Sequence, residues 1–139
     1  MSAGRVLDSW AVICYLGREP GFEGVAELFA ETVLAGGKLR MSTVNWGEVL
    51  YIAQRRRGRA AAREIEAAID ALPIEVIPAD KDTARQAAHV KAGGGMSYAD
   101  AFAVALAKLA GVELVTGDPE MEVAEKFVRV RWLVERRSR

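Results

Sequence analysis

Short apolar segments alternate with longer stretches of helical pattern along almost the whole chain, and this alternation restricts the folds open to it. Strands are predicted over residues 5–8, 39–41, 74–77, 113–116 and 128–133, and helices over residues 10–16, 22–35, 44–57, 59–72, 80–92 and 97–110. Strands that alternate with helices in this way pair in parallel and are covered by helices. We therefore expect an α/β fold, a three-layer sandwich with a central, mostly parallel sheet flanked by helices.

The length of the chain is that of one domain. Its 139 residues, of which 51% are hydrophobic, can fill a substantial core, so we expect a single domain over residues 1–139. The one cysteine, Cys14, lies in an apolar run and is expected to be a buried thiol in a reducing compartment. No early apolar run approaches the roughly 20 residues that cross a bilayer. A soluble, cytoplasmic protein with no membrane partner is therefore expected.

The charges balance overall but are distributed unevenly. Lys and Arg number 19, as do Asp and Glu, so the composition gives no overall attraction to nucleic acid. Two groups of arginines stand out: Arg55, Arg56, Arg57 and Arg59 in one segment, and Arg129, Arg131, Arg136, Arg137 and Arg139 near the C-terminus. Such groups can hold phosphates, but a solvated helix face and a chain end explain them equally well.

Four acidic residues interrupt apolar segments instead of lying in mixed polar stretches. They are Asp8, Glu48, Asp100 and Asp118. A carboxylate among buried neighbours is costly unless it is paired, hydrogen-bonded or bound to a metal. No lysine or arginine lies within four residues of Glu48 or Asp100, so an ion pair along the same helix cannot neutralise either acid.

The predicted topology gives these acids a common location. Asp8 and Asp118 lie at or just past the C-terminal ends of predicted strands, where ligands of open parallel sheets bind. Glu48 and Asp100 lie in early turns of helices that could cover that edge. Carboxylates gathered there would raise each other's pKa values, and a hard cation such as Mg²⁺ or Mn²⁺ removes that conflict. Because such a cation can activate a water and neutralise charge on a scissile phosphate, we hypothesise metal-dependent phosphodiester hydrolysis.

Most of these acids also have a purely structural interpretation. Asp8 could cap the helix that follows it. Asp100 could complete a capping box with Ser97. Asp118 precedes a proline, which is an ordinary turn pair. Glu48, in mid-helix among apolar neighbours, has no such local role.

Other catalytic chemistries find little support in the sequence. A single histidine, His89, and a single cysteine exclude zinc-finger and thiol-protease patterns in practice. His89 is expected at the surface or partly buried on an alanine-rich helix. The glycine run 93–95 is not followed by Lys-Ser or Lys-Thr, so it is no phosphate-binding P-loop.

Four segments resemble the motifs of PIN domains, in the same order. Residues 6–9 (VLDS), followed by an apolar helix, are similar to the opening of these domains, and residues 42–49 (STVNWGEV) are similar to their second acidic motif. Residues 96–107 (MSYADAFAVALA) resemble the third motif, and residues 114–120 (LVTGDPE) resemble the fourth. Each motif alone is loose, and their occurrence in order over nearly the whole chain is the specific signal.

The resemblance implies a sheet sandwiched by helices and a Mg²⁺ or Mn²⁺ ion that assists a water in attacking an RNA phosphodiester bond. The implied ligands are Asp8, Glu48, Asp100 and Asp118. Ser9, after the first acid, and Thr116, before the last, match positions that support the site in the family. Glu120 resembles an additional acid of some members, and Asn45, one helical turn before the second acid, could line the same pocket. Met121 stands where an aromatic residue is common, which concerns local packing and not catalysis.

A chain of this size most resembles the toxin half of a VapBC-type toxin–antitoxin pair. The resemblance implies an RNA substrate, a small antitoxin that covers the acidic groove, and a homodimer. The arginines at positions 55–57 and 59 are then expected to contact RNA or the antitoxin. Two alternatives stay open: a PIN nuclease of RNA processing or decay outside toxin–antitoxin systems, and a catalytically silent RNA-binding module.

Overall fold

A computed structural model describes residues 4–134, and its centre is a five-stranded sheet in the order β3-β2-β1-β4-β5. The strands are β1 (Val6–Leu7), β2 (Leu39–Ser42), β3 (Ile74–Ile77), β4 (Leu114–Thr116) and β5 (Val130–Trp132). Each neighbouring pair is parallel. The parallel sheet predicted from the alternation of strands and helices is therefore confirmed.

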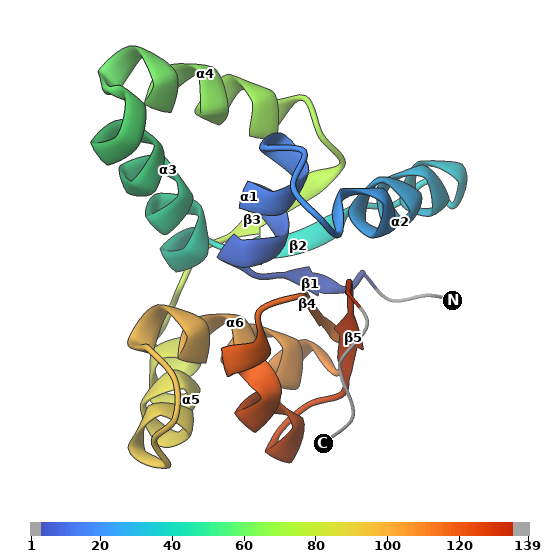
Figure 1. Ribbon diagram of the computed structural model, residues 1–139. Coiled ribbons are helices and arrows are strands. Elements are labelled where there is room, and N and C mark those ends of the chain that lie inside the picture. Colours follow the sequence, from blue (N-terminus) through green and yellow to red (C-terminus); the bar gives the residue numbers. More distant parts are fainter. Residues whose placement is uncertain (1–3, 135–139) are drawn as a thin grey trace.

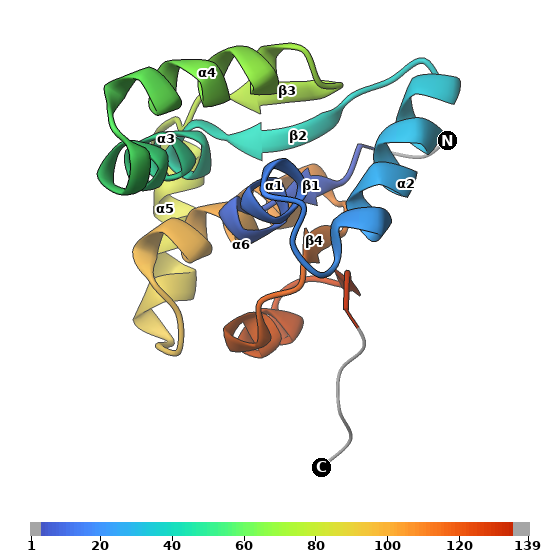
Figure 2. The same cartoon turned by 45° about the horizontal axis from the view of Figure 1, so that its top comes forward.

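Helices cover both faces of the sheet and complete the predicted three layers (Figures 1 and 2). One face carries α1 (Ser9–Leu16), α2 (Phe22–Leu34), α3 (Thr43–Arg57) and α4 (Arg59–Asp70). The other face carries α5 (Lys81–Ala92), α6 (Tyr98–Ala110) and the 3-10 helix η1 (Pro119–Lys126). No helix in residues 4–134 is long and apolar enough to cross a membrane.

The two faces of the sheet bury separate apolar clusters. Val6 and Leu114 pack in the cluster that includes α5 and α6, whereas Leu7 and Val115 pack in the cluster that includes α1 and α2. Successive strand residues point to opposite faces, so both residues of each pair are buried. This double burial explains why the central strands read as continuous apolar runs.

The helix starts bring several segments to the carboxyl edge of the sheet. α1 and α3 each begin directly after a strand, β1 and β2, so their first turns lie at that edge. α6 ends at Gly111 and leads by a short connection into β4, so α6 runs antiparallel to the strand and its first turn also lies there. Every residue from Ala101 to Ala107 is buried, which fixes α6 beneath the sheet.

Element boundaries differ from the sequence prediction mainly at the strand ends. The first and last strands are shorter than predicted, and Asp8 lies outside β1 as the cap of α1. Only a turn is predicted after residue 117, but the chain forms η1. Its buried residues Met121 and Ala124 are three apart, which matches the period of a 3-10 helix. Cys14 is buried and His89 exposed, as expected, whereas Arg136, Arg137 and Arg139 lie outside the described residues.

Gly117→Ala should destabilise the protein. A Cβ at Gly117 would overlap the Trp10 ring, whereas a Cβ at Gly47, in the interior of α3, meets no atom of the described residues within 4 Å. We expect Gly117→Ala to lower the free energy of unfolding by about 1–3 kcal/mol. The matched control Gly47→Ala should raise it by up to about 1 kcal/mol, because alanine favours helix. Urea unfolding measures both; equal stabilities of the two variants would contradict the close Trp10 contact.

Candidate active site

Asp8 is the most deeply buried of the four candidate acids. It follows β1 directly, is 1% exposed, and caps α1 by accepting a hydrogen bond on Oδ1 from the amide of Ala11 at 2.8 Å. The capping role anticipated from the sequence is therefore real. In this role one side-chain oxygen of Asp8 accepts a hydrogen bond from a backbone amide, but the carboxylate gains no cationic partner.

Asp118 lies next to Asp8 because their strands are neighbours. β1 pairs with β4 through Leu7 and Val115, and each acid follows the end of its strand. Asp118 caps η1 through Oδ1 and the amide of Glu120 at 2.9 Å. The buried Thr116 hydroxyl accepts from the amide of Asp118 at 3.1 Å and hydrogen-bonds the Asp8 carboxylate, so Thr116 connects the two acids.

Glu48 is held toward this edge by Ser9. The Ser9 hydroxyl donates to Oε1 of Glu48 at 2.5 Å, although the two residues are 39 positions apart in the sequence. Ser9 is the first residue of α1, directly after Asp8, and Glu48 belongs to α3. The contact explains how a mid-helix glutamate without a local partner is accommodated.

Asn45 joins three of the segments that carry the acids. Its side chain is fully buried, and Nδ2 donates to the Ser9 hydroxyl at 3.2 Å and to the carbonyl of Ala99 at 3.1 Å. Ala99 precedes Asp100 in the first turn of α6. Asn45 therefore ties α3 to both α1 and α6, beside Asp100. The sequence pointed to Asn45 and Ser9 as supporting residues but gave no sign of the Ala99 carbonyl.

Burial and mutual repulsion disfavour the ionised form of two of these acids. Burial raises the pKa of Asp8 to about 7, and the charges of Asp100 and Asp118 add to the rise, against hydrogen bonds from Thr116 and Ala11. Burial likewise raises the pKa of Asp100, with contributions from Glu48 and Asp118 and an opposing hydrogen bond from Ser97. The four candidate acids therefore form one electrostatically coupled group.

The carboxylates are coupled without converging on a single point. Within residues 4–134, no three His, Cys, Asp or Glu side chains are close enough to form a ready-made metal cage. The exposed Glu120 touches Asp118 through its backbone amide. The arginines at the end of α3 and the start of α4 are exposed, and they lie beyond Glu48 along the chain.

A family comparison decides which fold family this arrangement represents. Residues 5–126 match the family model described as the PIN domain, which includes all four candidate acids. The chain belongs to the PIN domain family. The resemblance read from the four motifs is thereby confirmed.

Known relatives of this PIN domain are similar over most of their length. Ribonuclease VapC30 of Mycobacterium tuberculosis is 30% identical over 117 residues, which cover 79% of this chain and 86% of the relative. Among solved structures, a DNA-bound VapBC of Salmonella typhimurium superposes with a TM-score of 0.76 at 17% identity, covering 96% of this chain and all of that one. VapC20 of M. tuberculosis, a sarcin-ricin loop-cleaving toxin, superposes with a TM-score of 0.67 at 21% identity, covering 92% of this chain and 99% of that one.

The donor set of this PIN domain fits a hard divalent cation. Carboxylate oxygens are the ligands that Mg²⁺ and Mn²⁺ prefer, and a bound cation would favour the ionised forms of Asp8 and Asp100, which burial and, to a smaller extent, the neighbouring carboxylates disfavour. Mg²⁺ commonly binds through one or two carboxylates and keeps several waters, so a full protein cage is not required. Oδ1 of Asn45 is buried without a hydrogen-bond partner in residues 4–134. That oxygen fits a site in which further ligands, such as bound waters, are expected.

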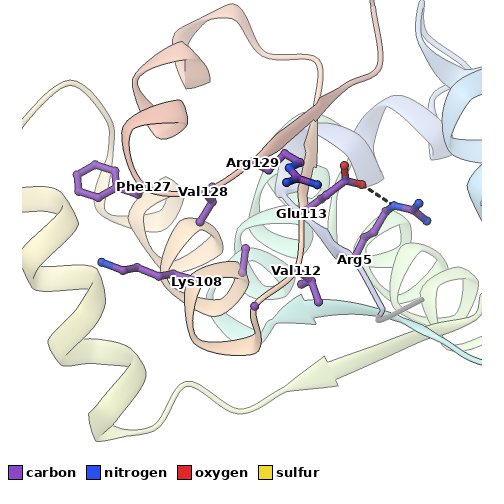
Figure 3. Close-up of a pocket in the computed structure, with 9 residues that line it drawn as sticks. Arg5, Lys108, Val112, Glu113, Phe127, Val128 and Arg129 are labelled. Carbon is purple, nitrogen blue, oxygen red and sulfur yellow. Dashed lines mark hydrogen bonds and ion pairs between the residues drawn. The ribbon is translucent and has the colours of Figure 1, made fainter. Parts of the chain in front are cut away.

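A separate hollow lies at the opposite, amino edge of the sheet (Figure 3). It has a volume of about 430 Å³. Its lining includes Arg5, Glu113 and Arg129, which directly precede β1, β4 and β5, and Lys108 in the last turn of α6. Arg5 and Glu113 form an ion pair of 2.7 Å there. The hollow contains none of the four candidate acids, so it is distinct from the candidate active site.

Proposed function

We propose that this PIN domain is a metal-dependent endoribonuclease that acts as the toxin of a toxin–antitoxin pair. The observation that carries the proposal is the gathering of Asp8, Asp118 and Glu48 at one edge of the sheet, because β1 pairs with β4 directly before the two aspartates and Ser9, next to Asp8, hydrogen-bonds Glu48. These acids have no cationic partner among their described contacts. The 30% identity to VapC30, a ribonuclease, supports the choice of RNA as the substrate.

The chain's own residues would divide the work at this site. Asp8, Glu48, Asp100 and Asp118 would hold Mg²⁺ or Mn²⁺. When bound, such a cation lowers the pKa of water and neutralises negative charge on a phosphate. Ser9 orients Glu48 through their hydrogen bond. Thr116 stabilises the ionised form of Asp8, and Asn45 fixes α6 beside α3.

Cleavage of RNA by the purified chain tests the nuclease. Total cellular RNA is incubated with the protein in Mg²⁺ or Mn²⁺ and, separately, in EDTA. Asp100→Asn controls for contaminating nucleases. We expect cleavage that needs the metal and disappears in the variant. Equal cleavage by a correctly folded Asp100→Asn protein would show that the activity does not come from the proposed acidic site, and cleavage in EDTA would show that it does not need a metal.

The antitoxin, the homodimer and a cytoplasmic place of action belong to the same proposal. The fold neighbour from S. typhimurium is a VapBC complex, which supports an antitoxin as the partner, and the cytoplasm is where an RNA substrate is found. Induced expression of the chain alone should arrest bacterial growth, and Asp100→Asn should not. An unaffected culture with abundant folded protein would favour a nuclease of RNA processing over a toxin.

Thr116→Val should slow cleavage in a pH-dependent way. The hydrogen bond from Thr116 lowers the pKa of Asp8, so removing the hydroxyl raises that pKa further and leaves less ionised carboxylate at pH 7. We expect cleavage at pH 7 to slow by about 10- to 100-fold, as for other residues that support a metal ligand, and the deficit to shrink toward pH 9. Rates measured across pH check this; a deficit independent of pH would contradict it.

A further inference from the structure

Tyr51 is a large aromatic side chain left on the surface next to the candidate active site. It is 51% exposed although it lies in the interior of α3. It follows Glu48 by three residues, a spacing that puts two side chains on the same face of a helix, about 4.5 Å apart along the axis. The Tyr51 ring therefore stands on the face of α3 that carries Glu48.

One arginine continues this face away from the acids, and a second lines the same hollow as the first. A hollow of about 420 Å³ is lined by Tyr51, Ile52, Arg55 and Arg56. Arg55 follows Tyr51 by four residues, so it also lies on the face of Glu48. A carboxylate, an aromatic ring and a guanidinium thus follow one another over about 10 Å of helix.

The position of the arginines at the end of α3 does not explain the exposed ring. Cations in the last turn complement the helix dipole, which accounts for Arg55 and Arg56 by themselves. Tyr98, which is 47% exposed, differs from Tyr51 in that its ring packs edge-on against Phe102 with 4.9 Å between centroids. Tyr51 makes no ring contact of this kind in residues 4–134.

We infer that Tyr51 and Arg55 form a nucleotide subsite, in which the Tyr51 ring stacks on an unpaired base and Arg55 binds a phosphate beside the scissile one. Aromatic rings with neighbouring cations bind single-stranded nucleic acid in this way, because every base has a face that can stack. Bases within a duplex are already stacked on their neighbours and cannot use the ring. The inference rests on the proposed RNA cleavage and assigns two residues of α3 to the binding of an unpaired nucleotide beside the scissile bond.

Binding measured in EDTA separates this inference from catalysis. The affinity of the full chain for a fluorescently labelled single-stranded oligoribonucleotide, and for its duplex, is compared among wild type, Tyr51→Phe and Tyr51→Leu. Tyr51→Phe keeps the stacking ring, whereas Tyr51→Leu keeps only apolar bulk. We expect Tyr51→Leu to bind the single strand on the order of tenfold more weakly, Tyr51→Phe to bind it like wild type, and duplex binding to be unchanged.

The cationic half of the subsite has its own matched pair of variants. Arg55→Gln should weaken single-strand binding and reduce the slope of log affinity against log salt by about 0.7, the loss of one phosphate contact. Lys38→Gln makes the same charge change at an exposed site before β2, at the amino edge of the sheet. It should leave the single-strand affinity and its salt dependence unaltered.

The outcomes for the subsite and for the nuclease are distinguishable. Single-strand affinity that is insensitive to Tyr51→Leu, or equal losses in Tyr51→Phe and Tyr51→Leu, would overturn the stacking role and leave the hollow to a protein partner. If wild type binds neither RNA, the inference fails as well. Ring-dependent binding without any metal-dependent cleavage would keep the subsite and refute the proposed function. Metal-dependent cleavage by Tyr51→Leu with the KM of wild type would keep the proposed function and overturn the subsite.

Discussion

Asp8→Asn is expected to abolish RNA cleavage while making the metal-free protein more stable. Asparagine can still accept the capping hydrogen bond from Ala11, so the start of α1 is preserved. It lacks the negative charge that a cation requires, and we expect the cleavage rate to fall on the order of 100-fold or more. It also removes a carboxylate whose ionised form is disfavoured by burial and by Asp100 and Asp118.

The pH dependence of stability identifies this carboxylate as the cause. The pKa of Asp8 is about 7 in the folded chain and near 4 in the unfolded chain, so between these values the folded state binds the additional proton. The free energy of unfolding of the metal-free protein therefore falls as the pH rises through this window, by at most roughly 4 kcal/mol. Asp8→Asn should lose most of this decrease, with Asp100 contributing the remainder, and added Mn²⁺ should restore stability to wild type alone.

A matched exposed acid controls for the loss of one negative charge. Glu75→Gln, on β3, removes an exposed carboxylate and should keep both the cleavage rate and the pH dependence of wild type. Urea unfolding from pH 4 to 8 in EDTA supplies the measurement. If Asp8→Asn kept the wild-type decrease in stability with pH, Asp8 would not be the buried, unpaired acid that the structure describes.

Asn45→Ala is expected to cause the second large effect, a loss of both stability and activity. The substitution removes the donors to the Ser9 hydroxyl and the Ala99 carbonyl, and it leaves a buried space. We expect the free energy of unfolding to fall by about 2–4 kcal/mol. Because α3 is no longer held to α6 beside Asp100, and Ser9 loses its fixed position against Glu48, cleavage should slow by about 10- to 100-fold.

Val49→Ala separates these two effects of the Asn45 substitution. Val49 is also buried on α3, one turn later, but it contributes no hydrogen bond from its side chain. Its truncation should lower stability by about 1–3 kcal/mol and leave the single-turnover rate of the folded protein near that of wild type. Equal rates for Asn45→Ala and Val49→Ala would show that the Asn45 network does not position the acids.

The sequence predicted the architecture because each strand is a short, mainly apolar segment that ends at a turn or a helix cap. That pattern places Asp8 and Asp118 at the C-terminal ends of strands in a parallel sheet, and the pairing of Leu7 with Val115 shows that the two strands are neighbours. The acids were conspicuous for the same reason, since charges that interrupt apolar runs need a partner. That they bind a metal stays a prediction.

Contacts between distant segments could not be read from the sequence. The hydrogen bonds from Ser9 to Glu48 and from Asn45 to Ala99 join residues 39 and 54 positions apart, and no local pattern encodes such pairs. η1 was missed because its apolar residues are few and a 3-10 helix lacks the period of an α-helix. Tyr51 did not stand out because the exposure of an aromatic residue is decided by packing around the whole helix.

Single-turnover cleavage by a set of matched variants tests the central claim most directly. The fragments that wild type produces locate its cut site, and one RNA that contains this site is the substrate. It is incubated in Mn²⁺ with each protein under identical conditions. The variants are Asp8→Asn, Glu48→Gln, Asp100→Asn and Asp118→Asn, with Glu75→Gln as the control. A shared acidic site predicts a loss on the order of 100-fold in each of the four and a wild-type rate in the control. Wild-type rates in correctly folded Asp8→Asn and Asp100→Asn would contradict a catalytic site at this edge of the sheet.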